Sequence, residues 1–171
     1  DLETIINTAL LLKESKEIVF VFIGSGAKKD YLLDFKAKHN LSNAFLLPYQ
    51  DFESLPYTLT AADLAFVSVS SEFETLVAPS KLYGHLAAGT PIAMICPKES
   101  YLDDLIIKFK FGKSFRSGEF DIISNWISEL KENPEICRNF TNKALSYINS
   151  YANEEIVTNK YYKVITRNLF N

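Results

Sequence analysis

The chain of 171 residues contains few of the residue types that mark unusual classes of protein. Six glycines and six prolines are too few for a collagen-like, low-complexity or disordered chain. The two cysteines, Cys96 and Cys137, are too few for a disulfide framework and are typical of a reducing cytoplasm. No hydrophobic run approaches the roughly 18 residues that a membrane span needs. Excess charge of one sign is also lacking, because 18 Lys and Arg face 21 Asp and Glu. The net charge of −3 therefore argues against a nucleic-acid partner, which requires a basic face.

The apolar content is sufficient for one substantial core. Hydrophobic residues make up 47% of the chain, and a chain of this length buries roughly 70% of its unfolded surface. No repeat, low-complexity tract or linker divides it, so we expect one domain over residues 1–171. The first residue is Asp1 and no signal-peptide pattern follows. We therefore expect the chain to be cut from a longer protein.

Four short apolar runs predict strands that are buried on both faces. Each run has four to six residues, hardly alternates with polar residues, and ends at Gly, Pro or Ser, as in a parallel sheet. The runs cover residues 18–23, 44–47, 64–67 and 91–96. Helical spacing is present in residues 2–12, in the segment before Asn40, and in the segment that ends at Gly89. Beyond Phe115 the pattern predicts helices only, at about 119–131, 134–150 and 153–169.

This alternation predicts an α/β fold of Rossmann type, a doubly wound parallel sheet with helices on both faces that closes in C-terminal helices. The chain begins inside a helix, without the strand that should precede it. We therefore expect the first strand of the sheet to be absent. In such a fold the ligand site lies beyond the carboxyl ends of the strands.

Two of the loops at these strand ends have features of a ligand site. Gly24-Ser25-Gly26 follows the first strand, and a tight turn with positive φ is as good an interpretation as ligand contact. Tyr49 and Gln50 follow the second strand, where an aromatic ring could hold a flat nucleobase or simply form part of a turn. A further glycine, Gly112, predicts a structural turn that leads to a short edge strand.

The strongest signal is the segment Ala78-Pro79-Ser80-Lys81 after the polar loop 68–77. Pro79 and Ser80 suit the opening of a helix. Free amides at a helix start, together with the helix dipole, favour a phosphate group, and Lys81 adds a positive charge. The alternative is a capped helix with a solvated lysine.

The histidines give no indication of a metal site. His85 is expected inside the helix after Lys81, where it either contacts the ligand or is partly buried, and His39 fits a helix end. Neither has a second ligand at metal spacing, and there is no Asp-x-Asp motif. We therefore expect no metal and no cofactor.

The segment 79–83, followed by 86–91, resembles the donor-binding segment of family 4 glycosyltransferases of the GT-B fold. It is most similar to the bacterial surface-polysaccharide branch that includes N-acetylfucosaminyltransferases. Residues 20–26 resemble the strand and glycine turn of that family, and residues 43–49 resemble its base-binding strand and loop. The resemblance covers nearly the whole chain but only the carboxyl-terminal half of the enzyme.

The resemblance implies the donor half of a glycosyltransferase that moves a sugar from a nucleoside diphosphate sugar, with UDP-sugar favoured, to a polysaccharide or lipid-linked acceptor with retained configuration. It implies an N-terminal acceptor domain that is absent here, so we expect the fragment alone to be inactive. We expect a cytoplasmic location, with the full-length enzyme peripheral at the inner membrane. The implied donor-binding residues are Gly24, Ser25, Gly26, Tyr49, Gln50, Ala78, Pro79, Ser80, Lys81 and Tyr83.

The sequence departs from the family at two glutamate positions, which Leu76 and Gly84 occupy here. Glu72 and Glu74 lie close by, either as sugar contacts or as solvated loop acids. No catalytic residue is assigned. Two alternatives remain: half of a UDP-sugar 2-epimerase, and a non-catalytic nucleotide-binding or scaffold module.

Overall fold

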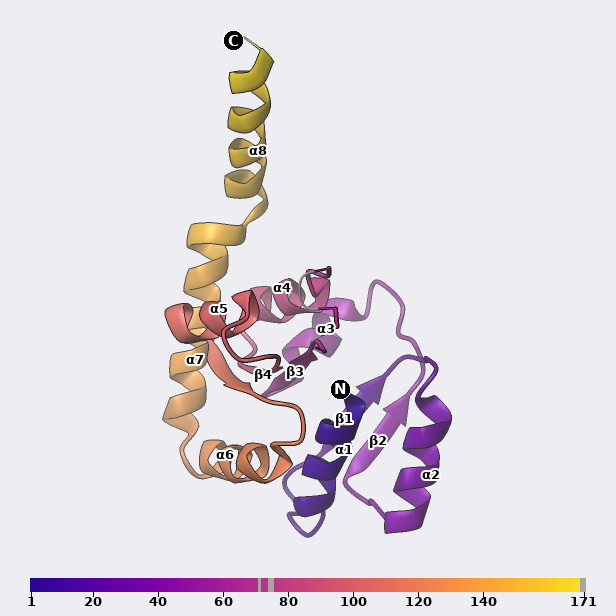
Figure 1. The fold of residues 1–171 in the computed structure, drawn as a ribbon. Helices are drawn as coiled ribbons and strands as arrows, with labels where there is room; N and C mark the ends of the chain where they lie inside the picture. Colours follow the sequence, from indigo (N-terminus) through magenta and orange to yellow (C-terminus); the bar gives the residue numbers. More distant parts are fainter. Residues whose placement is uncertain (71, 74–75, 170–171) are drawn as a thin grey trace.

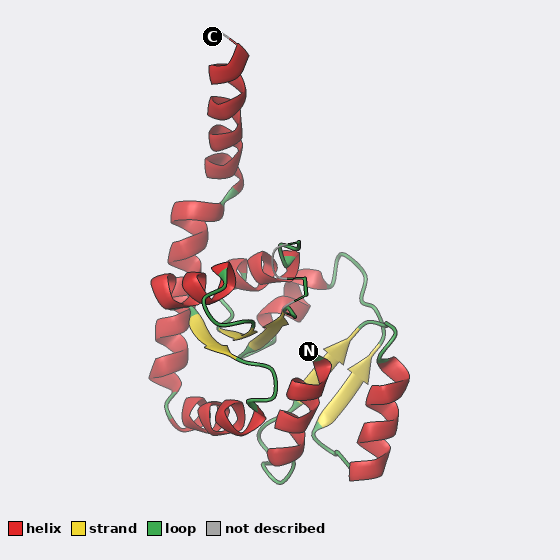
Figure 2. Ribbon diagram, in the orientation of Figure 1, coloured by secondary structure: helices red, strands yellow, loops and turns green. Residues whose placement is uncertain are grey.

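The computed structural model describes residues 1–70, 72–73 and 76–169, and it shows parallel strands flanked by helices (Figures 1 and 2). The N-terminal part contains α1 (Leu2–Leu11), β1 (Phe20–Ile23), α2 (Lys29–His39), β2 (Ala44–Leu47) and α3 (Leu55–Thr60). The middle part contains β3 (Ala65–Ser68), α4 (Ser80–Ala87), β4 (Ile92–Ile95), α5 (Tyr101–Phe109) and β5 (Gly112–Phe115). The C-terminal part contains α6 (Phe120–Glu132), α7 (Pro134–Tyr147), the π-helical turn η1 (Ile148–Ala152) and α8 (Glu154–Leu169).

The strands form two parallel sheets. β1 pairs with β2, with Phe20 opposite Ala44, and β3, β4 and β5 form a three-stranded sheet in that order. The fold class that the sequence predicts is confirmed as a Rossmann-like α/β arrangement. Its sheet is interrupted, however, because β1 and β3 form no strand pair with each other.

Two hydrophobic cores lie on the two faces of the three-stranded sheet. α1 and α6 cover one face, where Ala9, Ala93 and Trp126 belong to the same buried cluster. α4, α5 and α7 contribute to the other core, which contains Leu82 and Met94. All four residues of β4 are buried, which explains why its sequence is apolar without alternation.

The two-stranded sheet is buried on one face only, contrary to the sequence prediction. Phe20 and Ala44 pack into the core. Val21, Ile23, Phe45 and Leu47 point to the other face and are 42–50% exposed. The apolar runs 18–23 and 44–47 therefore mark strands whose second face no helix of the described chain covers.

The helix predictions hold, with changes at two places. The predicted helix 134–150 ends as α7 at Tyr147 and continues as η1, and α8 then projects away from the body (Figure 1). The short edge strand predicted at Gly112 is confirmed as β5, at the edge of the three-stranded sheet, but Gly112 is its first residue and not a turn before it. A Cβ atom there would lie 2.0 Å from the carbonyl oxygen of Ile92, so close packing against β4 requires glycine.

A buried ion pair ties α5 to the carboxyl ends of β4 and β5. The Asp103 carboxylate, 2% exposed, accepts hydrogen bonds from Arg116 Nη2 at 2.9 Å, from the Glu99 amide at 2.9 Å and from the Ser114 hydroxyl. Arg116 Nη1 donates to the Cys96 carbonyl oxygen at 2.9 Å. Burial opposes ionisation of Asp103, but its hydrogen bonds and the Arg116 charge hold its pKa below the ordinary value.

We predict that Asp103→Asn lowers the free energy of unfolding by about 2 kcal/mol or more, because Arg116 loses its buried partner. The stabilisation depends on the ionised carboxylate, so it is present above pH about 4 and is lost as the pH falls through the lowered pKa of the folded state. Urea unfolding at neutral and acidic pH measures both effects. Asp104→Asn, at an exposed position in the same helical turn, is the control and should change little. Equal effects of the two variants would contradict this assignment.

Candidate functional site

The carboxyl ends of both sheets meet around the start of α1. The backbone nitrogen of Asp1 lies 2.6 Å from Ser68 Oγ, at the end of β3. Leu2, the next residue, lines the same hollow as Gly24 and Lys28 in the loop after β1. The loops after β1 and β3 therefore lie at one edge of the molecule, although the two strands belong to different sheets. Loops at such an edge form the ligand crevice of doubly wound folds.

The structure brings together the loops after β1 and β2. Tyr49 Oη donates to the carbonyl oxygen of Ser25 at 3.1 Å, and its ring lies against Gly24. Gly24 has φ +117° and its amide donates to the Leu47 carbonyl oxygen at 3.0 Å. The Tyr49 side chain remains 75% exposed. Gln50 is also exposed, but its amide nitrogen donates to Pro48 O at 2.9 Å, within its own loop.

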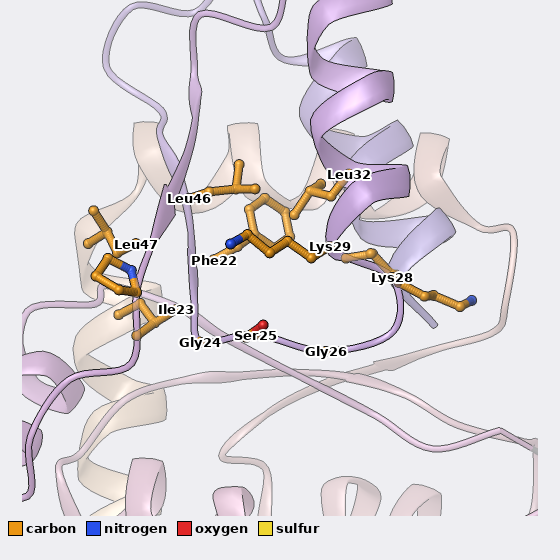
Figure 3. Close-up of a pocket in the computed structure, with 12 residues that line it drawn as sticks. Phe22, Ile23, Gly24, Ser25, Gly26, Lys28, Lys29, Leu32, Leu46 and Leu47 are labelled. Atoms are coloured by element: carbon orange, nitrogen blue, oxygen red, sulfur yellow. The ribbon is translucent and has the colours of Figure 1, made fainter.

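A hollow of about 360 Å³ opens beside these loops (Figure 3). Gly24, Ser25 and Gly26 form part of its wall, and Phe22 and Leu46 contribute apolar surface. The side chains that complete its lining are Leu2, Ile23, Lys28, Lys29, Leu32, Leu47 and Pro48. The glycine turn therefore both supports Tyr49 and borders an open cavity with two lysines.

The first residues of α4 are exposed, and no side chain of the described residues caps them. Ser80 is the first helical residue, and Pro79 occupies the cap position without a side-chain hydrogen bond. Ala78, Ser80 and Lys81 are exposed and Pro79 is half-buried. The side-chain cap of the alternative interpretation is not found in the described chain, whereas the exposed Lys81 fits a solvated lysine as well as an anion contact. The Leu82 amide donates to the Pro79 carbonyl oxygen at 3.0 Å. Among the described residues no side chain caps the helix, so the Ser80 and Lys81 amides and the positive end of the helix dipole can face an anion.

Lys81 and His85 share one side of α4, since they are four residues apart. Burial lowers the pKa of His85, and the positive charge of Lys81 lowers it further. Nδ1 of His85 is buried and has no hydrogen-bond partner in the described structure. Tyr83 points away from this pair, because its hydroxyl interacts with Tyr147 of α7. The structure therefore does not bring Tyr83 together with Lys81.

The two acidic candidates belong to the loop before α4, which the structure describes only in part. Glu72 is exposed in a turn of the loop before α4, and Glu74 lies outside the described residues. Leu76 is 75% exposed, whereas Gly84 faces Leu59 of α3. Within the residues that the structure describes, no group of three His, Cys, Asp or Glu side chains could hold a metal ion. No helix in this same part of the chain is both long and apolar enough to span a membrane.

Sequence reasoning overlooked two exposed aromatic residues near Tyr49. Phe52 is 86% exposed in the same loop, and Tyr57 on α3 is 78% exposed. The loop is held by Asp51, whose carboxylate accepts the Ser54 amide at 2.7 Å. Hydrogen bonds with Ser54 lower the pKa of Asp51. The sequence did contain an indication of Phe52, because an aromatic residue in a polar segment with Asp and Pro is expected to lie in an exposed loop.

We predict that Gly24→Ala destabilises the protein by about 1–3 kcal/mol, because the backbone has positive φ and a new Cβ would lie 3.1 Å from the Tyr49 ring. Gly26→Ala is the matched control, since nothing lies within 4 Å of its Cβ position. Chemical denaturation measures the difference. An equal stability of both variants would refute the constraint at Gly24.

We also predict that Lys81→Met raises the pKa of His85 toward its ordinary value, because the variant removes a neighbouring positive charge. The shift should be partial, since burial is the larger cause. An NMR titration of the His85 ring measures it. Lys143→Met, at an exposed position of α7, should leave the titration unchanged. An unchanged pKa of His85 in Lys81→Met would show that the two side chains are not neighbours.

Comparison with known proteins identifies the fold. No protein-family model matches the chain, and no curated protein matches it in sequence. Among solved structures, it is similar to a mutant of TarM from S. aureus in complex with fondaparinux, alpha-GlcNAc-glycerol and UDP. The TM-score is 0.75 at 18% identity, over 95% of this chain and 32% of TarM. A second TarM structure matches with a TM-score of 0.74 at 18% identity, over 94% of this chain and 31% of that one.

WaaG, a glycosyltransferase involved in lipopolysaccharide biosynthesis, is similar at a TM-score of 0.67 and 13% identity, over 87% of this chain and 39% of WaaG. The chain thus spans about a third of the length of these proteins. At such identities the similarity shows the fold alone. The chain has the Rossmann-like fold of one half of a GT-B glycosyltransferase.

Proposed function

We propose that this chain is the donor-binding half of a glycosyltransferase that uses a nucleoside diphosphate sugar, with UDP-sugar as the favoured donor. The observation that carries this proposal is the start of α4, which is uncapped, exposed and next to Lys81 at the carboxyl edge of the sheets. Helix amides and a lysine provide hydrogen bonds and positive charge for a diphosphate without a metal ion.

The aromatic loop after β2 is suited to the base of the nucleotide. The Tyr49 ring is held at one edge by its hydrogen bond to Ser25 and by its contact with Gly24, yet 75% of the residue is exposed. A fixed aromatic face of this kind stacks on a flat base. The proposed site therefore extends from the Tyr49 loop to the start of α4, around the N-terminus of α1.

In the proposed reaction this half stabilises the leaving group. As the bond from the sugar to the diphosphate breaks, negative charge grows on the diphosphate oxygen atoms. The amides of Ser80 and Lys81 and the Lys81 ammonium group are positioned to stabilise that charge more strongly in the transition state than in the ground state. Glu72 is the described acidic residue nearest in sequence to this helix start and is a candidate for contact with the sugar.

The finer assignments rest on the resemblance in residues 79–91 and on the character of the fold neighbours. We propose that the protein belongs to family 4, that it transfers the sugar with retained configuration, and that its acceptor is a polysaccharide or a lipid-linked molecule. We also propose that an acceptor domain lies elsewhere in the same protein and that the protein is cytoplasmic, at the inner membrane. UDP in the TarM complex supports the choice of nucleotide. If the acceptor is bound by that other domain, as proposed, residues 1–171 alone should not catalyse transfer.

A non-catalytic nucleotide-binding or scaffold module is the second candidate. It is favoured by one observation: Leu76 and Gly84 provide no carboxylates where the family often has glutamates, and Gly84 faces α3. A UDP-sugar 2-epimerase half would need more charged side chains in the crevice than the structure has. Measurement of nucleotide binding separates a donor site from a scaffold that binds none.

We predict that calorimetric titration shows weak binding of UDP, in preference to GDP and ADP. Lys81→Ala should reduce the affinity about tenfold, because a charge-assisted contact with the diphosphate contributes about 1.5 kcal/mol or more. Lys143→Ala on α7 is the matched control. Absence of binding by all three nucleotides, or equal affinity of the Lys81 and Lys143 variants, would contradict the proposed site.

A further inference from the structure

A hydrogen bond from α5 holds the segment that leads into α4. The Leu76 and Val77 amides both donate to the Phe73 carbonyl oxygen, at 3.0 and 3.1 Å, so these bonds stay within the loop itself. Among the hydrogen bonds of the described residues, a single one joins residues 76–79 to an element other than α4. In that bond Tyr101 Oη donates to the Val77 carbonyl oxygen at 2.9 Å. It lies two residues before the cap of α4.

The backbone around Tyr101 is fixed, because this residue is the first of α5. The cap of that helix is Ser100, 2% exposed, whose hydroxyl accepts the Asp103 amide at 3.2 Å. The Asp103 carboxylate accepts the Glu99 amide at 2.9 Å and pairs with Arg116, just after β5. The turn before Tyr101 is therefore anchored to the three-stranded sheet through the buried ion pair.

The backbone of Glu99 indicates that this turn has a defined shape. Its φ is +61°, in the left-handed region that non-glycine residues rarely adopt. Asn40 and Lys110 share this conformation, but they end α2 and α5, where it is common. Glu99 instead lies in the loop after β4, at the carboxyl edge of the sheet. A residue in such a conformation persists where its surroundings determine it, and binding sites are enriched in them.

We infer that Tyr101 is a positioning residue for the start of α4: its hydroxyl holds the Val77 carbonyl group and thereby fixes the direction of the Ser80 and Lys81 amides. The inference rests on the proposed function, because those amides are the proposed contacts of the diphosphate. Tyr101 acts through the backbone and need not touch the nucleotide. Without its hydroxyl the segment samples other conformations, and the affinity falls with the population of the conformation that can bind.

NMR relaxation of the chain without nucleotide tests the tether. Tyr101→Phe keeps the ring and removes the hydroxyl, and Tyr161→Phe, at an exposed position of α8, is the matched control. The order parameters of the Ala78, Ser80 and Lys81 amides should fall in Tyr101→Phe, from about 0.85 for a rigid backbone toward about 0.6. They should not change in Tyr161→Phe. Equal order parameters in the two variants would overturn the inference, whether or not UDP binds.

Titration with UDP tests the positioning role. Tyr101→Phe should weaken UDP binding about threefold or more, because loss of one hydrogen bond lowers the population of the binding conformation by about that factor. The loss should be smaller in a Lys81→Ala background, since part of the contact that Tyr101 positions is then gone. A merely structural role would not produce this dependence on Lys81. Tyr161→Phe should bind UDP like the parent chain.

The outcomes separate this inference from the proposed function. Unchanged UDP affinity in Tyr101→Phe, or an equal loss with and without Lys81, would overturn the positioning role while the donor site stands. Reduced order parameters together with an absence of UDP binding by the parent chain would support the tether and refute the proposed function alone.

Discussion

The common direction of the strands is the constraint on which the rest of the structure depends. Within each sheet the strands are parallel. The start of α1 contacts Ser68 at the end of β3, and Leu2 of α1 lines one hollow with the loops that follow β1 and β2, so the carboxyl ends of both sheets lie at one edge. Parallel strands need crossover helices, which here cover one face of β1 and β2 and both faces of β3–β5. All loops with candidate binding residues are therefore brought to the same edge. Function in this fold is determined by what those few loops carry.

The architecture could be predicted from the sequence to the extent that it depends on local patterns. Unalternated apolar runs identified β1 to β4, because buried parallel strands have no polar face. The same pattern could not show that Val21 and Ile23 lie on an uncovered face, since exposure depends on which helix packs there. Gly112 was interpreted as a turn because a glycine in sequence does not reveal a close approach of Ile92 from another strand.

The start of α4 was predictable from the sequence, but the orientation of the side chains around it was not. Helix-start residues such as Pro79 and Ser80 indicate where α4 begins, and the structure confirms that start. Tyr83 was predicted to bind the donor together with these residues. Its hydroxyl interacts instead with Tyr147 of α7. The contact of Tyr49 with Gly24 also lay beyond sequence reasoning, because it joins two loops that are 25 residues apart. Both facts depend on tertiary packing.

The central claim is that a nucleoside diphosphate binds across the shared edge of the two sheets. Backbone amide NMR spectra recorded during titration with UDP test it most directly. We expect chemical-shift changes that cluster at residues 24–26, 49–50 and 78–81, with none on α7 or the outer edge of β5. Changes confined to α7, or scattered over the surface without saturation, would contradict the account.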